Sequence, residues 1–157
     1  MTYRIDTPAT LFDMAELSGA NTLVGWAVAR EMWSGGETFA MRYGDELIGL
    51  FGLYPTETGA EAWFNIKKNA APHMMRLIRD IRLTLASRSY PEIVVICTTD
   101  AGRRIAIASG FHLFESDGEI THGKFVGRGQ QGSCKPAETG SSITAAANPC
   151  RSRQATG

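Results

Sequence analysis

The fold prediction rests on residues 62–73, which read Ala62-Trp63-Phe64-Asn65-Ile66-Lys67-Lys68-Asn69-Ala70-Ala71-Pro72-His73. The first five of these residues include aromatic and β-branched side chains, which is typical of a strand. A long helix is predicted over about residues 70–87, because apolar residues recur there at i, i+4, i+7 and i+11: Met74, Ile78, Ile81 and Leu85. Residues 92–98 then form a continuous apolar run, which predicts a central strand buried on both faces.

Two helices are predicted on the N-terminal side of this unit. Thr7 and Pro8 suit the N-cap and first position of a short helix that stops at Gly19. Asn21 can cap a second helix, which ends at residues 34–36. One helical stripe of the second helix carries Leu23, Val24, Ala27, Val28 and Met32.

Between these helices and the long helix, the pattern predicts a three-strand antiparallel meander. Residues 38–43 and 46–54 form two strands, and Gly44 with Asp45 makes a two-residue hairpin turn between them. A second turn leads into the strand that begins the quoted stretch. A further strand is predicted over residues 1–5.

The C-terminal side of the domain is predicted to contain a short helix and a hairpin. Asp100 can cap a helix that stops at Gly110. Residues 111–115 and 120–126 form a hairpin around an Asp-Gly turn.

The chain changes in composition after this hairpin. Residues 127–157 are rich in Gly, Ser and Ala, and Ile143 is their only large aliphatic residue. Such a segment buries too little apolar surface to offset the entropy of ordering it. We therefore predict one domain over residues 1–126 and a flexible tail that becomes ordered only when a partner holds it.

The composition is that of a globular domain of 157 residues with 43% hydrophobic residues. Sixteen acidic residues balance sixteen basic residues, but nine acids and three bases lie in residues 1–66. The first part therefore carries −6 and the remainder +6. No apolar run has the length of a membrane span, and the acidic N-terminal stretch does not resemble a signal peptide. The three cysteines lack zinc-ligand spacing, so we expect no metal and a reducing compartment, with Cys97 buried in its strand.

The element order resembles the GNAT (Gcn5-related N-acetyltransferase) fold over residues 1–126. The resemblance lies in two helices before a three-strand meander, in the strand that leads into the long helix, and in a late helix that ends in Gly110-Phe111. It implies an α/β fold of the α+β kind, with a mixed, mostly antiparallel sheet flanked by helices. In such enzymes the start of the long helix binds the pyrophosphate of acetyl-coenzyme A, because free backbone N–H groups and the helix dipole attract an anion.

The resemblance also indicates site residues. If acetyl-coenzyme A binds, it contacts residues of the loop after the strand, namely Ile66, Lys68, Asn69, Ala70, Ala71 and His73. If the chain is active, Glu61 is its general base. However, Ala71 stands where the family has glycine, Pro72 supplies no N–H, and Ala106 stands at the position of the family's catalytic tyrosine. On this basis we expect no cofactor, with acetyl-coenzyme A as the possible exception.

A narrower resemblance is to the GNAT-like internal virion protein of short-tailed bacteriophages. It rests on Trp63-Phe64, the arginine-rich helix, residues 93–98 and Gly110-Phe111. It implies a structural or assembly protein of the virion on a degenerate scaffold without catalysis, located in the virion and the host cytoplasm. Its partners are then other virion proteins, bound through residues 127–157.

Two alternatives remain open at this point. The first is an active acetyl-coenzyme A-dependent N-acetyltransferase of unknown acceptor. The second is a nucleic-acid contact module that neutralises phosphates with basic residues. The residues of this second alternative are Lys67, Lys68, Arg76, Arg79 and Arg82, with Arg88, Arg103 and Arg104 further along the chain.

Overall fold

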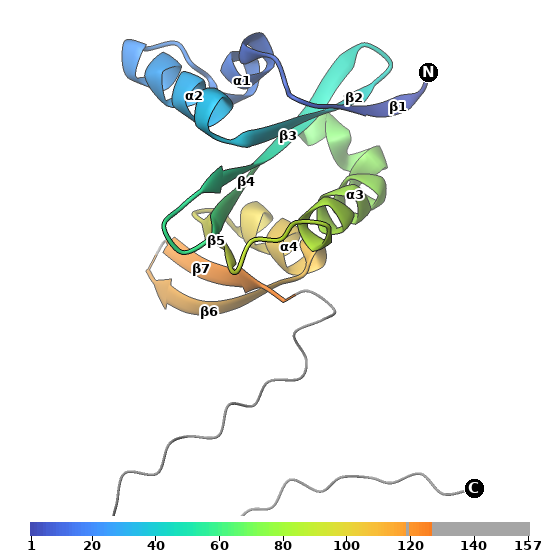
Figure 1. Ribbon diagram of the computed structural model, residues 1–157. Helices are drawn as coiled ribbons and strands as arrows, with labels where there is room; N and C mark the ends of the chain where they lie inside the picture. Colours follow the sequence, from blue (N-terminus) through green and yellow to red (C-terminus); the bar gives the residue numbers. More distant parts are fainter. Residues whose placement is uncertain (119, 127–157) are drawn as a thin grey trace, which may run out of the picture.

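The computed structural model describes residues 1–118 and 120–126 (Figure 1). A seven-stranded sheet in the order β1-β2-β3-β4-β5-β7-β6 forms its centre. Neighbouring strands are antiparallel except β4 and β5, which are parallel. The predicted mixed, mostly antiparallel sheet with flanking helices is therefore confirmed. The tail predicted over residues 127–157 lies outside the described residues and stays a prediction.

The four strands of the N-terminal part agree with the predicted meander and first strand. They are β1 Tyr3–Asp6, β2 Glu37–Tyr43, β3 Glu46–Pro55 and β4 Ala60–Ile66. Gly44 has a φ of 63° in the hairpin turn, a value that favours glycine. The residue types at the turn therefore predicted the position of the β2–β3 hairpin correctly.

The three remaining strands are β5 Ile93–Cys97, β6 Phe111–Asp117 and β7 Ile120–Phe125. The prediction that β5 is buried on both faces is wrong. Val95 and Cys97 are buried, but Ile96 is 44% exposed. The reason is that α3 and α4 cover one face of β5, whereas α1 and α2 lie over β2, β3 and β4 on the other face and do not reach it.

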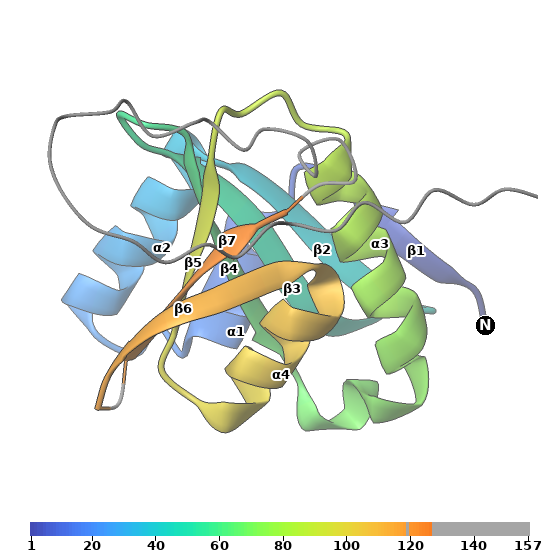
Figure 2. The same cartoon turned by 90° about the horizontal axis from the view of Figure 1, so that it is seen from below.

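Four α-helices flank the sheet: α1 Leu11–Ser18, α2 Leu23–Gly35, α3 Met74–Ala86 and α4 Asp100–Ser109. Figure 2 shows α1 and α2 together on one face of the sheet and α3 and α4 together on the other. The caps differ from the predicted ones. Thr10, Thr22 and Thr99 each accept a hydrogen bond from a backbone N–H three residues later, so α1 and α2 begin after the predicted caps and α4 is capped by the preceding residue.

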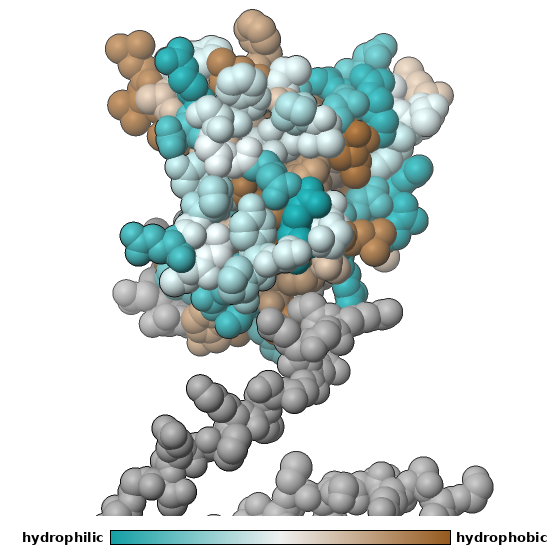
Figure 3. Space-filling model, in the orientation of Figure 1, coloured by the Kyte–Doolittle hydropathy of each residue, from teal (hydrophilic) through white to brown (hydrophobic). Residues whose placement is uncertain are grey.

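Most of the apolar stripe predicted for α2 does not face the core, although such stripes usually do. Leu23 is 90% exposed, Val24 is 73% exposed and Val28 is 52% exposed. The brown surface at the upper left of Figure 3 lies over the start of this helix. Instead, α2 packs on the sheet through Ala29 and Met32. α2 therefore buries only the narrow side that contacts β2 and β3.

The core has two parts, one on each face of the sheet. The larger part lies under α3 and α4 and includes Phe51, Leu77 and Ile81. The smaller part lies under α1 and α2 and includes Met14 and Leu50. None of the helices in the described part of the chain is both long and apolar enough to cross a membrane.

Candidate functional site

β4 and β5 run side by side for only a short distance. They pair at three positions, from Ala60–Ile93 to Ala62–Val95, after which β4 continues to Ile66 without a pairing partner on that side. At the paired end the strands are in close contact, because a Cβ on Gly59 would lie 2.0 Å from the carbonyl oxygen of Glu92. The divergence leaves one backbone edge of β4 available to a ligand.

A groove lies between α3 and α4 on one face of the sheet. Its volume is about 430 Å³, and it is lined by Met74, Ile78, Ala101, Arg104, Ile105 and Ala108. The two helices lie side by side in Figure 2, and the groove runs along their contact. The lining is apolar apart from one guanidinium group, which suits a ligand with an apolar stem and an anionic end.

The connection from β4 to α3 is a 3₁₀ turn, η1 Lys68–His73, and not the start of the α-helix that we predicted from residue 70. The N–H of Ala70 donates to Lys67 O at 3.1 Å, and the N–H of Met74 donates to Ala71 O. The backbone turns tightly around Pro72, which has no N–H to donate. The first N–H groups of the helical segment are therefore those of Lys68 and its neighbour Asn69, several residues before α3.

Side chains hold η1 against the rest of the domain. Lys67 forms an ion pair of 2.5 Å with Glu16 of α1, and Asn69 donates a hydrogen bond to Glu46 of β3. The imidazole of His73 stacks on Tyr43 of β2 with 4.2 Å between ring centroids.

Some of the predicted cofactor-binding residues are buried, and others are exposed to solvent. Ala70 is fully buried, and Ile66 packs against the large core, so their side chains contact protein. Lys68, Asn69 and Ala71 are exposed. Lys68 is therefore a positively charged side chain of this loop that an anion in solvent can reach.

The basic residues of the nucleic-acid hypothesis differ in their contacts, because some of them interact with other side chains of the domain. Arg76 lies over the ring of Tyr3, 4.5 Å from its centroid, and Arg79 pairs with Asp80 at 3.2 Å. Arg82 and Lys68 are both exposed. Arginines that already contact protein groups are less available to bind phosphates. The nucleic-acid hypothesis stays a prediction.

Glu61 faces a second cavity on the opposite face of the sheet. This cavity, which we call the α2 cavity, has a volume of about 610 Å³ and is lined by Ala27, Val28, Glu31, Met32, Tyr54 and Glu61. The hydroxyl of Tyr54 donates a hydrogen bond of 2.6 Å to Glu31. This hydrogen bond and the negative charge of Glu31 raise the pKa of Tyr54.

The sequence indicated Glu61 as a candidate base, which stays a prediction, but it did not indicate Glu31 and Tyr54, which line the same cavity. Two signals could have found them. The turn at residues 55–59 places Tyr54 opposite Glu61 in an antiparallel hairpin. Glu31 lies on α2 at i+4 and i+3 from Ala27 and Val28, so it shares their face.

Comparison with known proteins identifies solved structures that have the same fold. No protein-family model matches the chain, and no curated protein is similar to it in sequence. Several solved structures nevertheless have the same fold. An acetyltransferase from Bacillus subtilis in complex with coenzyme A has a TM-score of 0.60 at 15% identity, over 79% of this chain and 98% of that chain. An N-acetyltransferase from Staphylococcus aureus Mu50 has a TM-score of 0.61 at 12% identity, over 80% and 97%.

A third similar structure is a GNAT family acetyltransferase from Elizabethkingia anophelis with acetyl-coenzyme A bound. Its TM-score is 0.56 at 12% identity, and the match covers 78% of this chain and 97% of that one. This is the GNAT acetyltransferase fold. The narrower resemblance to phage virion proteins finds no support among these structures.

The GNAT fold of this chain lacks a tyrosine on α4. Ala106 is fully buried and carries no hydroxyl group. Cys97 is also buried, as predicted, and burial raises the pKa of its thiol. In the part of the chain that the structure describes, no three His, Cys, Asp or Glu residues are grouped so that they could hold a metal ion.

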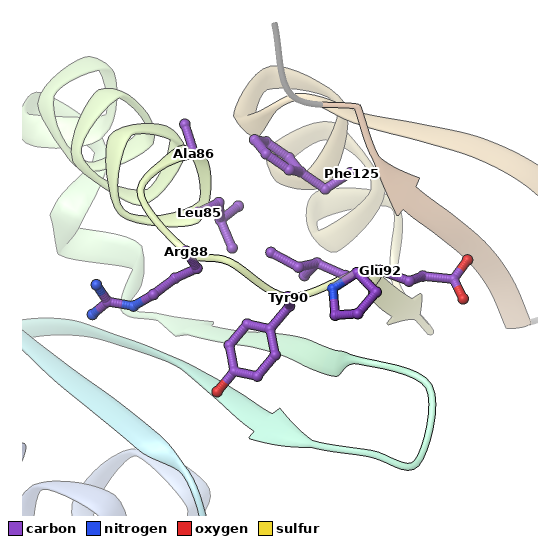
Figure 4. A pocket seen from close by; sticks show the side chains of 8 residues that line it. Leu85, Ala86, Arg88, Tyr90, Glu92 and Phe125 are labelled. Atoms are coloured by element: carbon purple, nitrogen blue, oxygen red, sulfur yellow. The ribbon is translucent and has the colours of Figure 1, made fainter. Parts of the chain in front are cut away.

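A small pocket of about 110 Å³ lies between the end of α3 and the start of β5 (Figure 4). Arg88 forms an ion pair of 2.6 Å with Glu37 of β2, and the hydroxyl of Tyr90 donates to the same carboxylate at 3.2 Å. In Figure 4 the carboxylate of Glu92 points away from Arg88 and Tyr90. The pocket is too small for a cofactor, and its polar groups tie the α3–β5 loop to β2.

Proposed function

We propose that this chain is an acetyl-coenzyme A-dependent N-acetyltransferase. One observation carries the proposal: the groove between α3 and α4 and the α2 cavity lie on opposite faces of a sheet whose strands β4 and β5 diverge after Ala62 and Val95. A donor bound on one face and an acceptor bound on the other can meet where the two strands part. Two of the similar structures hold coenzyme A or acetyl-coenzyme A.

The chemistry of the groove fits this donor. Met74, Ile78 and Ile105 offer apolar contacts for the pantetheine arm, and the unpaired edge of β4 offers backbone groups for its amides. Arg104 in the groove and Lys68 on η1 supply positive charge for the phosphates. Since Pro72 removes a backbone donor, we expect phosphate binding here to depend more on these side chains than on a glycine loop.

When bound, acetyl-coenzyme A supplies the acetyl group as a thioester. The residues of the chain prepare the acceptor. An amine attacks only after it loses its ammonium proton, and the carboxylate of Glu61 lies in the α2 cavity, where it can accept that proton. In the transfer, a bond forms between the amine nitrogen and the acetyl carbon while the carbon–sulfur bond breaks. Ala106 has no hydroxyl group and could not protonate the leaving thiolate, so water would supply that proton.

The first test is binding of acetyl-coenzyme A to the full chain, followed by calorimetry and by thermal unfolding. Ligand at about one hundred times its Kd stabilises the native state by about 2.7 kcal/mol, which raises the Tm measurably. Arg104→Ala should weaken binding, whereas Arg30→Ala, an exposed arginine on α2, is the matched control. The proposal fails if a millimolar concentration gives neither heat nor a Tm shift and no amine releases free thiol.

A further inference from the structure

The α2 cavity contains more negative charge than one reacting amine needs. We infer that it takes an aliphatic diamine, in which Glu61 receives the reacting amine and Glu31 holds the second ammonium group. The inference rests on the proposed function, because it names the acceptor of the same reaction.

The first support is the unpaired charge. Among the ion pairs of the described residues, none involves Glu31 or Glu61. Arg30 is next to Glu31 in the chain, but adjacent helical residues point to different sides. Two carboxylates therefore face one cavity without a basic side chain, and a ligand with two positive charges complements them.

The second support is the way in which Glu31 is held. Its carboxylate accepts the 2.6 Å hydrogen bond from Tyr54, which itself lies opposite Glu61 in the β3–β4 ladder. Tyr54 therefore links the two residues, since its hydroxyl reaches the Glu31 carboxylate and its backbone pairs with that of Glu61. One short molecule can therefore place an ammonium group at Glu31 and an amine at Glu61.

The third support is the apolar wall between the carboxylates. Ala27, Val28 and Met32 of α2 line the same cavity, and methylene groups fill such a wall better than hydroxyl groups do. A monoamine with an apolar chain would cover Glu31 without pairing it, which removes water from a charge at a cost in free energy. A diamine avoids this cost because its second ammonium group pairs with the carboxylate.

A divalent metal ion does not explain the same charge. Among the described residues, no three His, Cys, Asp or Glu side chains are grouped so that they could hold a metal ion. The volume of about 610 Å³ is instead in the range of small organic ligands.

The test compares diaminobutane with butylamine, which has the same chain and one charge fewer. Calorimetry on the full chain should give at least about tenfold tighter binding of the diamine, since it makes one more charge-assisted hydrogen bond. Glu31→Gln should remove this preference, because the diamine loses the partner of its second ammonium group and butylamine no longer covers an unpaired charge. Glu57→Gln, an exposed acid in the turn before β4, is the matched control and should leave both affinities as they are.

Equal affinity for the two amines, or an unchanged preference in Glu31→Gln, would overturn the inference. Circular dichroism checks that each variant is folded, and Tyr54→Phe gives a second variant that should reduce the preference by freeing Glu31. Acetyl transfer then separates the two proposals. Equal transfer to both amines refutes the diamine site but keeps the acetyltransferase, whereas selective diamine binding with no transfer refutes the acetyltransferase and keeps the site.

Discussion

Tyr54 lies directly opposite Glu61 in the antiparallel ladder between β3 and β4. Directly paired residues point to the same face of a sheet with their Cβ atoms about 5 Å apart. Since the Tyr54 hydroxyl also reaches Glu31, the register of one hairpin brings together groups from two strands and a helix. The α2 cavity therefore depends on this pairing, and its chemistry can be tested one residue at a time.

Glu61→Gln should lower kcat for acetyl transfer by about 10²–10⁴-fold, because a general base contributes a factor of this size. The affinity for acetyl-coenzyme A should stay the same, since Glu61 lies on the other face of the sheet from the groove. Steady-state kinetics and calorimetry measure the two quantities. A full kcat in this variant would mean that another group removes the proton.

Ala108→Trp should block the groove between α3 and α4. Ala108 is exposed and lines the groove, so an indole ring there occupies the space of the pantetheine arm while leaving the core intact. We expect at least about tenfold weaker acetyl-coenzyme A binding, or about 1.4 kcal/mol. Ile107→Trp, at an exposed neighbour outside this groove, is the control. Equal binding by both variants would place the donor elsewhere.

Gly59→Ala should destabilise the fold by about 1–3 kcal/mol, because overpacking forces the backbone apart. The added Cβ would lie 2.0 Å from Glu92 O, at the end where β4 and β5 are paired. Gly102→Ala provides the comparison, since it meets only the Thr99 hydroxyl at 3.1 Å and gains helix propensity. Urea unfolding measures both, and a stable Gly59→Ala protein would contradict the close contact.

Asp13→Asn should destabilise the native state by about 1–3 kcal/mol at neutral pH. Asp13 is buried, which raises its pKa, but hydrogen bonds from the Thr10 backbone and hydroxyl and from Arg42 outweigh this, so the pKa is lowered overall. A carboxyl with a lowered pKa stabilises the fold above its unfolded pKa of about 3.9 and loses this contribution as the pH falls further.

The difference between the native chain and Asp13→Asn should therefore be full at pH 7 and shrink as the pH drops below about 4. Urea unfolding of both proteins at the two ends of this range is the measurement. A difference that does not depend on pH would show that the charge of Asp13 does not contribute.

Much of the element order could be predicted because its signals are local. Gly44 and Gly110 both have positive φ values in the structure, and each marks a turn or helix end that was predicted from the glycine at that position. The strand patterns around them also depend only on neighbouring residues. Helix starts were predicted less well, since Thr7 and Thr10 both suit a cap and only the Asp13 carboxylate, which accepts a hydrogen bond from the Thr10 N–H, favours the second.

The amino-acid pattern alone was therefore enough for the strands, the main helices and the GNAT resemblance, because their signals lie in residues close together in the chain, whereas the role of Glu61 stays a prediction. The exposed stripe of α2, the divergence of β4 from β5 and the meeting of Glu31 with Tyr54 required the tertiary structure. These features join residues that are far apart in sequence, and their positions follow from how helices pack on a twisted sheet, which no local pattern encodes.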